Sequence, residues 1–369
     1  MQPLSGILVL DFTTLLPGPL ATLMLAEAGA EVIKIERPEG EDMRARGGGA
    51  VADDAAFAQL NRGKKGITLD LKNESDRNRL RPLLQKADVL VEQFRPGVMS
   101  RLGLGFAEVR KINPKIVYCS ISGYGQEGPR AGEAGHDINY QSRTGLLALQ
   151  PGPTDKPVIP PALIADIGGG TMPAVINVLL GLRQRDATGE AVHLDIAMTD
   201  AMFTFAWYAW AIGHATGTFP APGALRLVGA SPRYQLYPTR DGAIVACGAL
   251  EQKFWLAFCN TIALPAPLMN DVADPEATKA AIADVIRRES AEHWRPKFAA
   301  ADCCVTIMAS LEEALRDPHF VERGLFAHKV ATANGAIMPA VPLPIAAALR
   351  EKPGTKAAPK LGQDNDLLK

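Results

Sequence analysis

The fold is indicated first by residues 7–36, ILVLDFTTLLPGPLATLMLAEAGAEVIKIE. Residues 7–11 and 31–36 are short apolar runs that are typical of strands, and residues 19–28 between them have the pattern of a helix. Gly29 stands where a glycine commonly ends a helix. A strand, a helix and a second strand in this order predict two parallel strands that are joined by a helical crossover.

The same alternation continues along the N-terminal part of the chain. The further predicted elements are strands at residues 67–71, 88–94 and 116–122 and a helix at residues 74–86. Right-handed crossovers place helices on both faces of a parallel sheet, so we predict an α/β fold with an open, doubly wound sheet. Ligands of such sheets bind outside the carboxyl ends of the strands. Those ends are followed by the segments after Asp11, Glu36, Phe94 and Ser122.

The middle of the chain has a different pattern. Residues 168–185 are predicted to form a long helix, and residues 193–195 to begin a helix that runs toward Trp210. Residues 219–223 are rich in proline and glycine, which interrupt helices and strands, so this segment is predicted to be a linker.

A second unit follows the linker. Residues 234–237 and 243–247 predict two short strands, and Asp241-Gly242 between them is the strongest hairpin signal in the chain. Helices are predicted at residues 251–262, 275–289 and 291–301. This unit is therefore expected to be a small α+β domain, and the C-terminal residues after it to be extended and lightly packed.

Composition and charge exclude several classes of protein. The 369 residues include 39 Lys and Arg and 40 Asp and Glu, for a net charge of −1. A general nucleic-acid binder needs a basic face that releases counterions, so that class is excluded. The five cysteines form no CxxC pair, which favours a reduced, cytoplasmic compartment. No signal peptide is expected, because Asp11 stops the first apolar run.

Two apolar segments need to be considered as membrane spans. Residues 163–182 include Asp166, three consecutive glycines and Pro173, and residues 201–213 are too short to cross a bilayer. We therefore expect both to be buried helices.

Two glycine runs match neither the dinucleotide fingerprint nor the P-loop. Residues 47–49 are expected to form a mobile surface loop. Residues 168–170 follow Asp166 and open an apolar helix, where backbone N–H groups and the helix dipole favour negative charge. The alternative, which spacing alone favours, is that Asp166 is only the N-cap of that helix.

Basic residues stand beside the predicted strands. Arg37, Lys65 and Arg95 are candidates for binding phosphate, which arginine can hold with two hydrogen bonds. The alternative for each is a solvated surface charge.

One stretch combines several chemically active side chains, GHDINY at residues 135–140. His136 is a candidate general base near neutral pH, or a hydrogen-bonded structural histidine. No histidine spacing supports a metal site, and no G-x-S-x-G elbow supports an α/β-hydrolase. Glu251, in the stretch CGALE at residues 247–251, either caps the following helix or orients a histidine.

Taken together, the chain resembles the family III CoA-transferases, which include formyl-CoA transferase and α-methylacyl-CoA racemase. The matching stretches run in order along nearly the whole chain: LSGILVLD at 4–11, PGP at 17–19, GAEVIKIERP at 29–38, NRGKK at 61–65, ADVLVE at 87–92, FRPG at 94–97, SGYG at 122–125 and ADIGG at 165–169.

The resemblance implies an architecture and a ligand. A large, discontinuous, Rossmann-like CoA-binding domain is expected at residues 1–200 and 325–369, a linker helix and loop at 201–229, and a small α+β domain at 230–324. Two subunits are implied to interlock as a homodimer. Arg37, Lys65 and Arg95 match positions that hold CoA. CoA belongs to the substrate, so no separate cofactor, metal, nucleic acid or membrane partner is expected.

The matches favour the α-methylacyl-CoA racemase branch. The resemblance implies that His136, supported by Glu251, and Asp166 act as acid and base on opposite faces of the α-carbon of a 2-methylacyl-CoA, through an enolate. Backbone N–H groups near Gly168 and Gly169 are expected to hold the enolate oxygen. The substrate contacts are expected to include Asp137 and Tyr140.

Two alternative functions remain possible at this point. The first alternative is an acyl-CoA:carboxylate CoA-transferase in which Asp166 is the nucleophile, and the second is a catalytically silent CoA-binding protein. Arg233 is a candidate contact for a polar or acidic acyl group, and residues 202–210 line an acyl channel or pack in the core.

Overall fold

The computed structural model describes residues 2–45, 51–152 and 158–369, so the glycine run at residues 47–49 lies outside the described residues. The chain divides into two compact units. The first contains residues 1–144, 161–205 and 318–369, and the second residues 145–160 and 206–317. Compared with the expected domains, residues 201–205 and 318–324 group with the first unit, and residues 145–160 and 206–229 with the second.

A parallel sheet of six strands forms the centre of the first unit, which confirms the predicted α/β class. Its strand order is β3-β2-β1-β4-β5-β6, the order of a Rossmann-type sheet. The strands are β1 (Leu8–Phe12), β2 (Glu31–Glu36), β3 (Lys65–Thr68), β4 (Val89–Glu92), β5 (Val117–Ser122) and β6 (Val192–Ala197). Because β1 pairs with both β2 and β4, the strand order reverses there and opens a crevice at the carboxyl ends.

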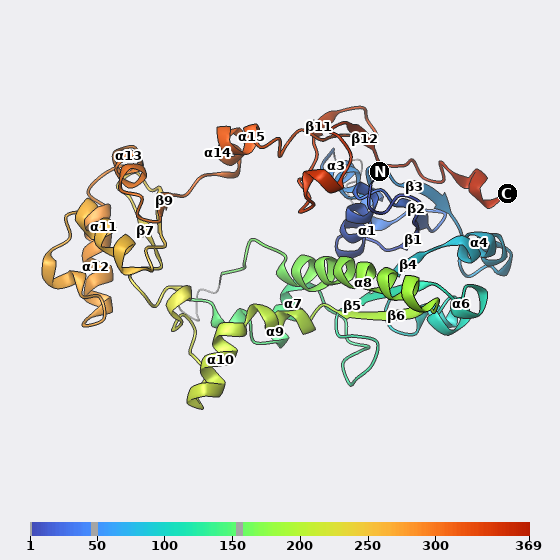
Figure 1. The fold of residues 1–369 in the computed structure, drawn as a ribbon, viewed down its shortest axis with the longest axis horizontal. Coiled ribbons are helices and arrows are strands. Elements are labelled where there is room, and N and C mark those ends of the chain that lie inside the picture. The colour runs from blue at the N-terminus through green and yellow to red at the C-terminus, as the bar shows by residue number, and fades with distance from the viewer. Residues whose placement is uncertain (1, 46–50, 153–157) are drawn as a thin grey trace. The chain divides into compact units, whose positions relative to one another are not determined.

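Helices cover both faces of this sheet (Figure 1). On one face, Leu10, Ile33 and Leu90 form a core with Leu80 and Leu84 of α4. On the other face α1 packs against α3 and α8. These helices are α1 (Pro17–Glu27), α3 (Val51–Asn61), α4 (Glu74–Lys86), α6 (Phe106–Ile112) and α8 (Met172–Thr188).

The expected helix at residues 193–195 is wrong, because these residues lie in strand β6. Val192, Leu194 and Ile196 alternate with polar residues, which is the period of a strand. A side chain at Gly181 of α8 would press on both Val192 and Leu194, so one face of β6 packs closely on that helix. The next helix begins only at α9 (Asp200–Phe205).

The helix over Ala165–Thr188 is, within the described residues, the one long and apolar enough to cross a membrane. One side of it packs against α1, α9, β5 and β6. Its other side exposes Ile176, Leu179 and Leu180, whose relative exposures are 56%, 45% and 61%. The expectation of a buried helix therefore holds for one face of α8. It is wrong for residues 201–213, where Phe203, Trp207 and Trp210 are 46%, 62% and 50% exposed.

The second unit has its own antiparallel sheet, in the order β7-β8-β9. The predicted hairpin is present, and Gly242 in its turn has a φ of 80°. The core under this sheet includes Trp255, Phe258 and Trp294. The elements are β7 (Gln235–Pro238), β8 (Ile244–Cys247), β9 (Val305–Ile307), α10 (Trp207–Thr216), α11 (Gln252–Thr261), α12 (Pro275–Ile286), α13 (Ala291–Ala301) and α14 (Leu311–Arg316).

The C-terminal residues are more ordered than expected, because they form a three-stranded sheet on the first unit. Val330 of this sheet is fully buried against Ala58 of α3. The strands are β10 (Lys329–Ala331), β11 (Ile337–Pro339) and β12 (Thr355–Ala357), and the remaining short helices are α2 (Asp42–Ala45), α5 (Val98–Arg101), α7 (Asp137–Arg143) and α15 (Pro318–Glu322).

A buried ion pair joins β1 to the segment before β3. Lys64 Nζ lies 3.0 Å from Asp11 Oδ2, and both side chains are 0% exposed. Although burial raises the pKa of Asp11, the attraction of Lys64 and Lys34 and two hydroxyl hydrogen bonds lower it to about 2. The pair is therefore ionised at neutral pH, at the point where the sheet opens its crevice.

Candidate active site

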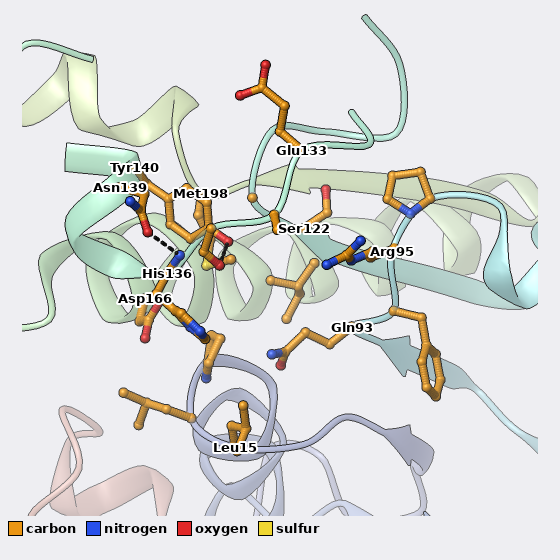
Figure 2. Close-up of a pocket in the computed structure, with 18 of the residues that line it drawn as sticks. Leu15, Gln93, Arg95, Ser122, Glu133, His136, Asn139, Tyr140, Asp166 and Met198 are labelled. Carbon is orange, nitrogen blue, oxygen red and sulfur yellow. Dashed lines mark hydrogen bonds between the residues drawn. The ribbon is translucent and has the colours of Figure 1, made fainter. Parts of the chain in front are cut away.

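A pocket of about 510 Å³ lies in the first unit at the carboxyl ends of the central strands (Figure 2). It is lined by the segments after β1, β4 and β5, which are three of the places that the sequence indicates. It also receives the start of α7 and the turn that carries Asp166. The side chains that bear on its chemistry are Leu15, Gln93, Arg95, Glu133, His136, Tyr140 and Asp166.

His136 is the N-cap residue of α7, and its side chain is exposed in the pocket. Its backbone N–H donates to Asn139 Oδ1 at 3.0 Å, so Asn139 closes the first turn of the helix. The backbone of His136 is thus anchored, which leaves the imidazole directed at the pocket (Figure 2).

Asp166 lies in the same pocket, half-buried in the π-turn Ala165–Thr171 that leads into α8. Burial and the neighbouring carboxylate of Asp137 raise the pKa of Asp166 to about 6, and the attraction of His136 opposes them. A carboxyl group with this pKa can both accept and return a proton near neutral pH.

Asp137 ties the two reactive residues together. Its Oδ1 accepts from the backbone N–H groups of Ala165 and Asp166 at 2.7 and 3.0 Å, and its Oδ2 accepts from Gln141 at 2.6 Å. The side chain is buried. Asp137 therefore positions the Asp166 turn from the residue next to His136, instead of contacting substrate as expected.

We expect Asp137→Asn to lower the pKa of Asp166. The variant keeps an acceptor for both N–H groups but removes the like charge that helps to raise this pKa. If Asp166 acts as a base, the acid limb of the pH–rate profile of α-proton exchange should move to lower pH. The plateau rate should fall by less than about tenfold, since the two hydrogen bonds to the Asp166 turn are kept. An acid limb that stays in place would contradict this coupling.

Tyr140 forms part of the pocket wall. Its ring occupies the space that side chains at Gly123 and Gly135 would need, and its hydroxyl donates to the carbonyl oxygen of Gly135 at 2.5 Å. Burial raises the pKa of Tyr140 to about 12, so the phenol stays protonated. The hydroxyl is thus engaged in holding the loop before His136, and its expected contact with substrate stays a prediction.

The expected oxyanion role of Gly168 and Gly169 does not agree with their placement. Both lie inside the π-turn rather than at its first residues, and neither lines the pocket. A side chain at Gly169 would collide with the carbonyl oxygen of Met198, and one at Gly168 with Phe205. These glycines allow close packing, and the first two amides of the turn are already bound by Asp137.

The three candidate phosphate ligands lie in different places. Arg95 is exposed in the active-site pocket. Arg37 lines a second pocket of about 410 Å³ at the ends of β1–β3, where its guanidinium pairs with Asp42 at 2.6 Å. Lys65 begins β3 at the opposite edge of the sheet and pairs with Glu31 at 2.6 Å. Lys65 lies in neither pocket, because it is at the amino end of its strand, whereas both pockets lie at the carboxyl ends of the strands.

Glu251 is the N-cap residue of α11 in the second unit. The carbonyl oxygen before it, that of Leu250, accepts from Arg226 and Arg233 at 3.1 and 3.3 Å. Arg233 also binds Asp271 through two hydrogen bonds of 2.9 and 2.6 Å. Arg233 is therefore occupied inside the second unit, which argues against the expected contact with an acidic acyl group.

Two residues of the pockets are not predicted from the sequence. Gln93 accepts from the backbone N–H of Gly18 at 2.9 Å and so fixes the start of α1 at the pocket. Lys72 lines the second pocket beside Arg37. Their positions after β4 and β3 are the only signal, because strand-end residues gather at one edge of a parallel sheet.

Glu92, at the end of β4, is a buried acid next to Gln93 in the chain. It is 4% exposed and accepts from the backbone N–H of Phe94 at 2.8 Å. Burial raises the pKa of Glu92 to about 7, although hydrogen bonds from Ser120 and Phe94 oppose the shift. The folded protein therefore holds the Glu92 proton more tightly than the unfolded chain.

We expect this shift to make stability depend on pH. Folding raises the pKa of Glu92 from 4.5 to about 7. The contribution of Glu92 to the free energy of unfolding is therefore fully present below pH 4.5 and is lost as the pH rises through 7. The free energy of unfolding of Glu92→Gln, measured with urea, should therefore rise relative to that of wild type by about 2 kcal/mol from pH 5 to pH 8. Glu39→Gln, at an exposed acid, is the control. A difference that does not change with pH would contradict the expectation.

Comparison with known proteins adds the following. The model of CoA-transferase family III matches residues 4–365. Acetyl-CoA:oxalate CoA-transferase of Acetobacter aceti is 33% identical over 100% of this chain and 95% of its own length. Alpha-methylacyl-CoA racemase of Mus musculus is 32% identical over 98% of this chain and 91% of its own. The crystal structure of Rv3272 from M. tuberculosis has a TM-score of 0.84 at 27% identity, covering 100% of this chain and 99% of that one.

Proposed function

The chain belongs to CoA-transferase family III, and from this premise we propose that it is an acyl-CoA racemase that acts on 2-methylacyl-CoA thioesters. One observation carries the proposal: a histidine and a carboxyl group with a pKa of about 6 share one pocket at the carboxyl ends of the sheet. Relatives with racemase and transferase activity are similarly identical to this chain, so the choice rests on the site.

The proposed reaction is a proton exchange at the α-carbon. One of the pair His136 and Asp166 removes the α-proton from one face, and the C–H electrons move into the thioester carbonyl to form an enolate. The other residue then delivers its own proton to the opposite face, which regenerates the thioester with inverted configuration. Each turnover leaves the two residues with exchanged protonation states, which a pKa near neutrality permits.

Binding of CoA is assigned to the same edge of the sheet. Arg37 and Lys72 in the second pocket, and Arg95 in the first, supply positive charge for phosphate groups. Lys65 is left out of this assignment because of its place at the other edge. Glu251, in the second unit, stays a prediction as the residue that supports protonated His136.

The second candidate is an acyl-CoA:carboxylate CoA-transferase. Here the Asp166 carboxylate attacks the thioester carbonyl, forms an acyl anhydride and releases CoA as thiolate, as the half-exposed position of Asp166 would permit. The similarity to acetyl-CoA:oxalate CoA-transferase favours keeping it. This mechanism has no need of a proton-transferring histidine.

One experiment separates the two candidates. The protein is incubated with an (S)-2-methylacyl-CoA in heavy water without any carboxylate acceptor, and deuterium at the α-carbon is followed by NMR. Incorporation of deuterium with loss of chirality supports the racemase. Absence of exchange, together with CoA transfer once oxalate or succinate is added, would overturn it.

A homodimer is the proposed assembly. The exposed Ile176, Leu179 and Leu180 give α8 an apolar outer face, which a second copy of the chain would cover. Light scattering should then give a mass of about twice 39.4 kDa. A monomer at micromolar concentration would contradict the proposal.

A further inference from the structure

Leu15 has an unusual backbone. Its φ is 62°, in the left-handed region. Of the four non-glycine residues with positive φ in the described chain, it alone has a branched apolar side chain, the others being Ala263, Asp302 and Cys304. Bulky side chains are disfavoured there because Cβ approaches the following carbonyl oxygen. Such strain persists only where the surroundings impose it.

The surroundings of Leu15 do impose it. Before it, the Thr13 backbone N–H and hydroxyl both donate to Asp11 Oδ1, at 2.9 and 2.5 Å. After it, the hydroxyl of Thr171 donates to the carbonyl oxygen of Pro17 at 2.8 Å. Both ends of the turn are thus fixed to buried parts of the first unit, and Leu15 absorbs the strain between them.

The side chain of Leu15 lines the pocket and does not join the core cluster on which its neighbour packs. Its neighbour Leu16 packs on a cluster that contains Leu20 and Leu23, whereas Leu15 is absent from that cluster. Instead Leu15 is half-buried and lines the pocket of His136 and Asp166, below them in Figure 2. The strained turn therefore presents an apolar side chain to the reaction site.

We infer that Leu15 is a specificity-determining residue, whose side chain forms the wall against which the alkyl substituent on the α-carbon lies. This inference rests on the proposed function, because it takes the pocket to be the acyl site. It predicts preference for branched over unbranched acyl groups, since an added methyl group gains contact with Leu15.

The test replaces Leu15 with asparagine. Asparagine has nearly the same shape and tolerates positive φ, so the turn is kept while the apolar surface is lost. We expect the thermal midpoint of Leu15→Asn to equal or exceed that of wild type. We expect the Kd of a 2-methylacyl-CoA to rise about tenfold, the loss expected when a methyl contact is removed, with the Kd of free CoA unchanged. A residue that served only the fold would lower the midpoint and leave the Kd alone.

The matched control is Ala263→Asn, at an exposed residue of the second unit with a φ of 53°. It should raise the thermal midpoint without changing either Kd. The readout is binding, so it remains valid whichever reaction the wild type catalyses in heavy water. The inference is overturned if Leu15→Asn binds the branched thioester within twofold of wild type, or if branched and unbranched thioesters weaken equally.

Discussion

Replacing His136 by glutamine is expected to slow racemisation of a 2-methylacyl-CoA by about 10³-fold, because glutamine is polar but transfers no proton. The side chain is exposed in the pocket, and the backbone hydrogen bond that anchors the residue does not involve the ring. The fold and the binding of CoA should therefore be unaffected. Loss of chirality of an (S)-2-methylacyl-CoA gives the rate, and titration calorimetry gives the affinity for CoA.

Asp166→Asn should slow racemisation to a similar extent, for the same reason. The two variants together separate the candidate functions. A transferase that uses Asp166 as nucleophile loses activity in Asp166→Asn but not in His136→Gln, whereas a racemase needs both residues. His293→Gln, at a half-exposed histidine of the second unit, is the matched control and should keep full activity. Racemisation by His136→Gln within tenfold of wild type would remove His136 from the mechanism.

Replacing Lys64 by methionine is expected to lower the free energy of unfolding by about 3–5 kcal/mol, because it leaves a buried carboxylate without its main partner. Lys64 Nζ donates to Asp11, Thr22, Asn61 and the carbonyl oxygen of Pro19, at 2.8–3.0 Å. Methionine fills the volume but satisfies none of these groups. Urea unfolding, with the slope compared to wild type, measures the loss.

The neighbouring lysine provides the control. Lys65→Met should change stability by less than about 0.5 kcal/mol, because its ion pair with Glu31 is exposed. The double variant Asp11→Asn/Lys64→Met should recover part of the loss, since it removes the unpaired charge as well. If Lys64→Met and Lys65→Met lower stability equally, the buried pair is not what holds β1 to this segment.

Much of the fold could be predicted because its signals are local. The predicted bounds of β2 and α4 agree with the structure. Asn73 caps α4 by accepting from the backbone N–H of Ser75, a signal contained in neighbouring residues. The prediction of a helix at β6 is wrong although the local signal of a strand is present, because Val192, Leu194 and Ile196 alternate with polar residues.

The residue types of the site could be predicted from the sequence, but their placement could not. The residue types at His136 and Asp166 could be singled out, but Lys65 shows that a basic residue beside a strand can lie at the wrong edge. The role of Asp137 could not be foreseen, because its partners are amides of a turn that is remote in the chain.

The sequence by itself determined the α/β class, the family and the residues that can transfer protons, since these depend on periodicity and residue type. Only the tertiary structure decided which of them share a pocket, that the pKa of Asp166 is raised to about 6, and that Leu15 is held at positive φ. The reason is physical: burial, like-charge proximity and imposed strain arise between segments that packing brings together, and no local pattern encodes them.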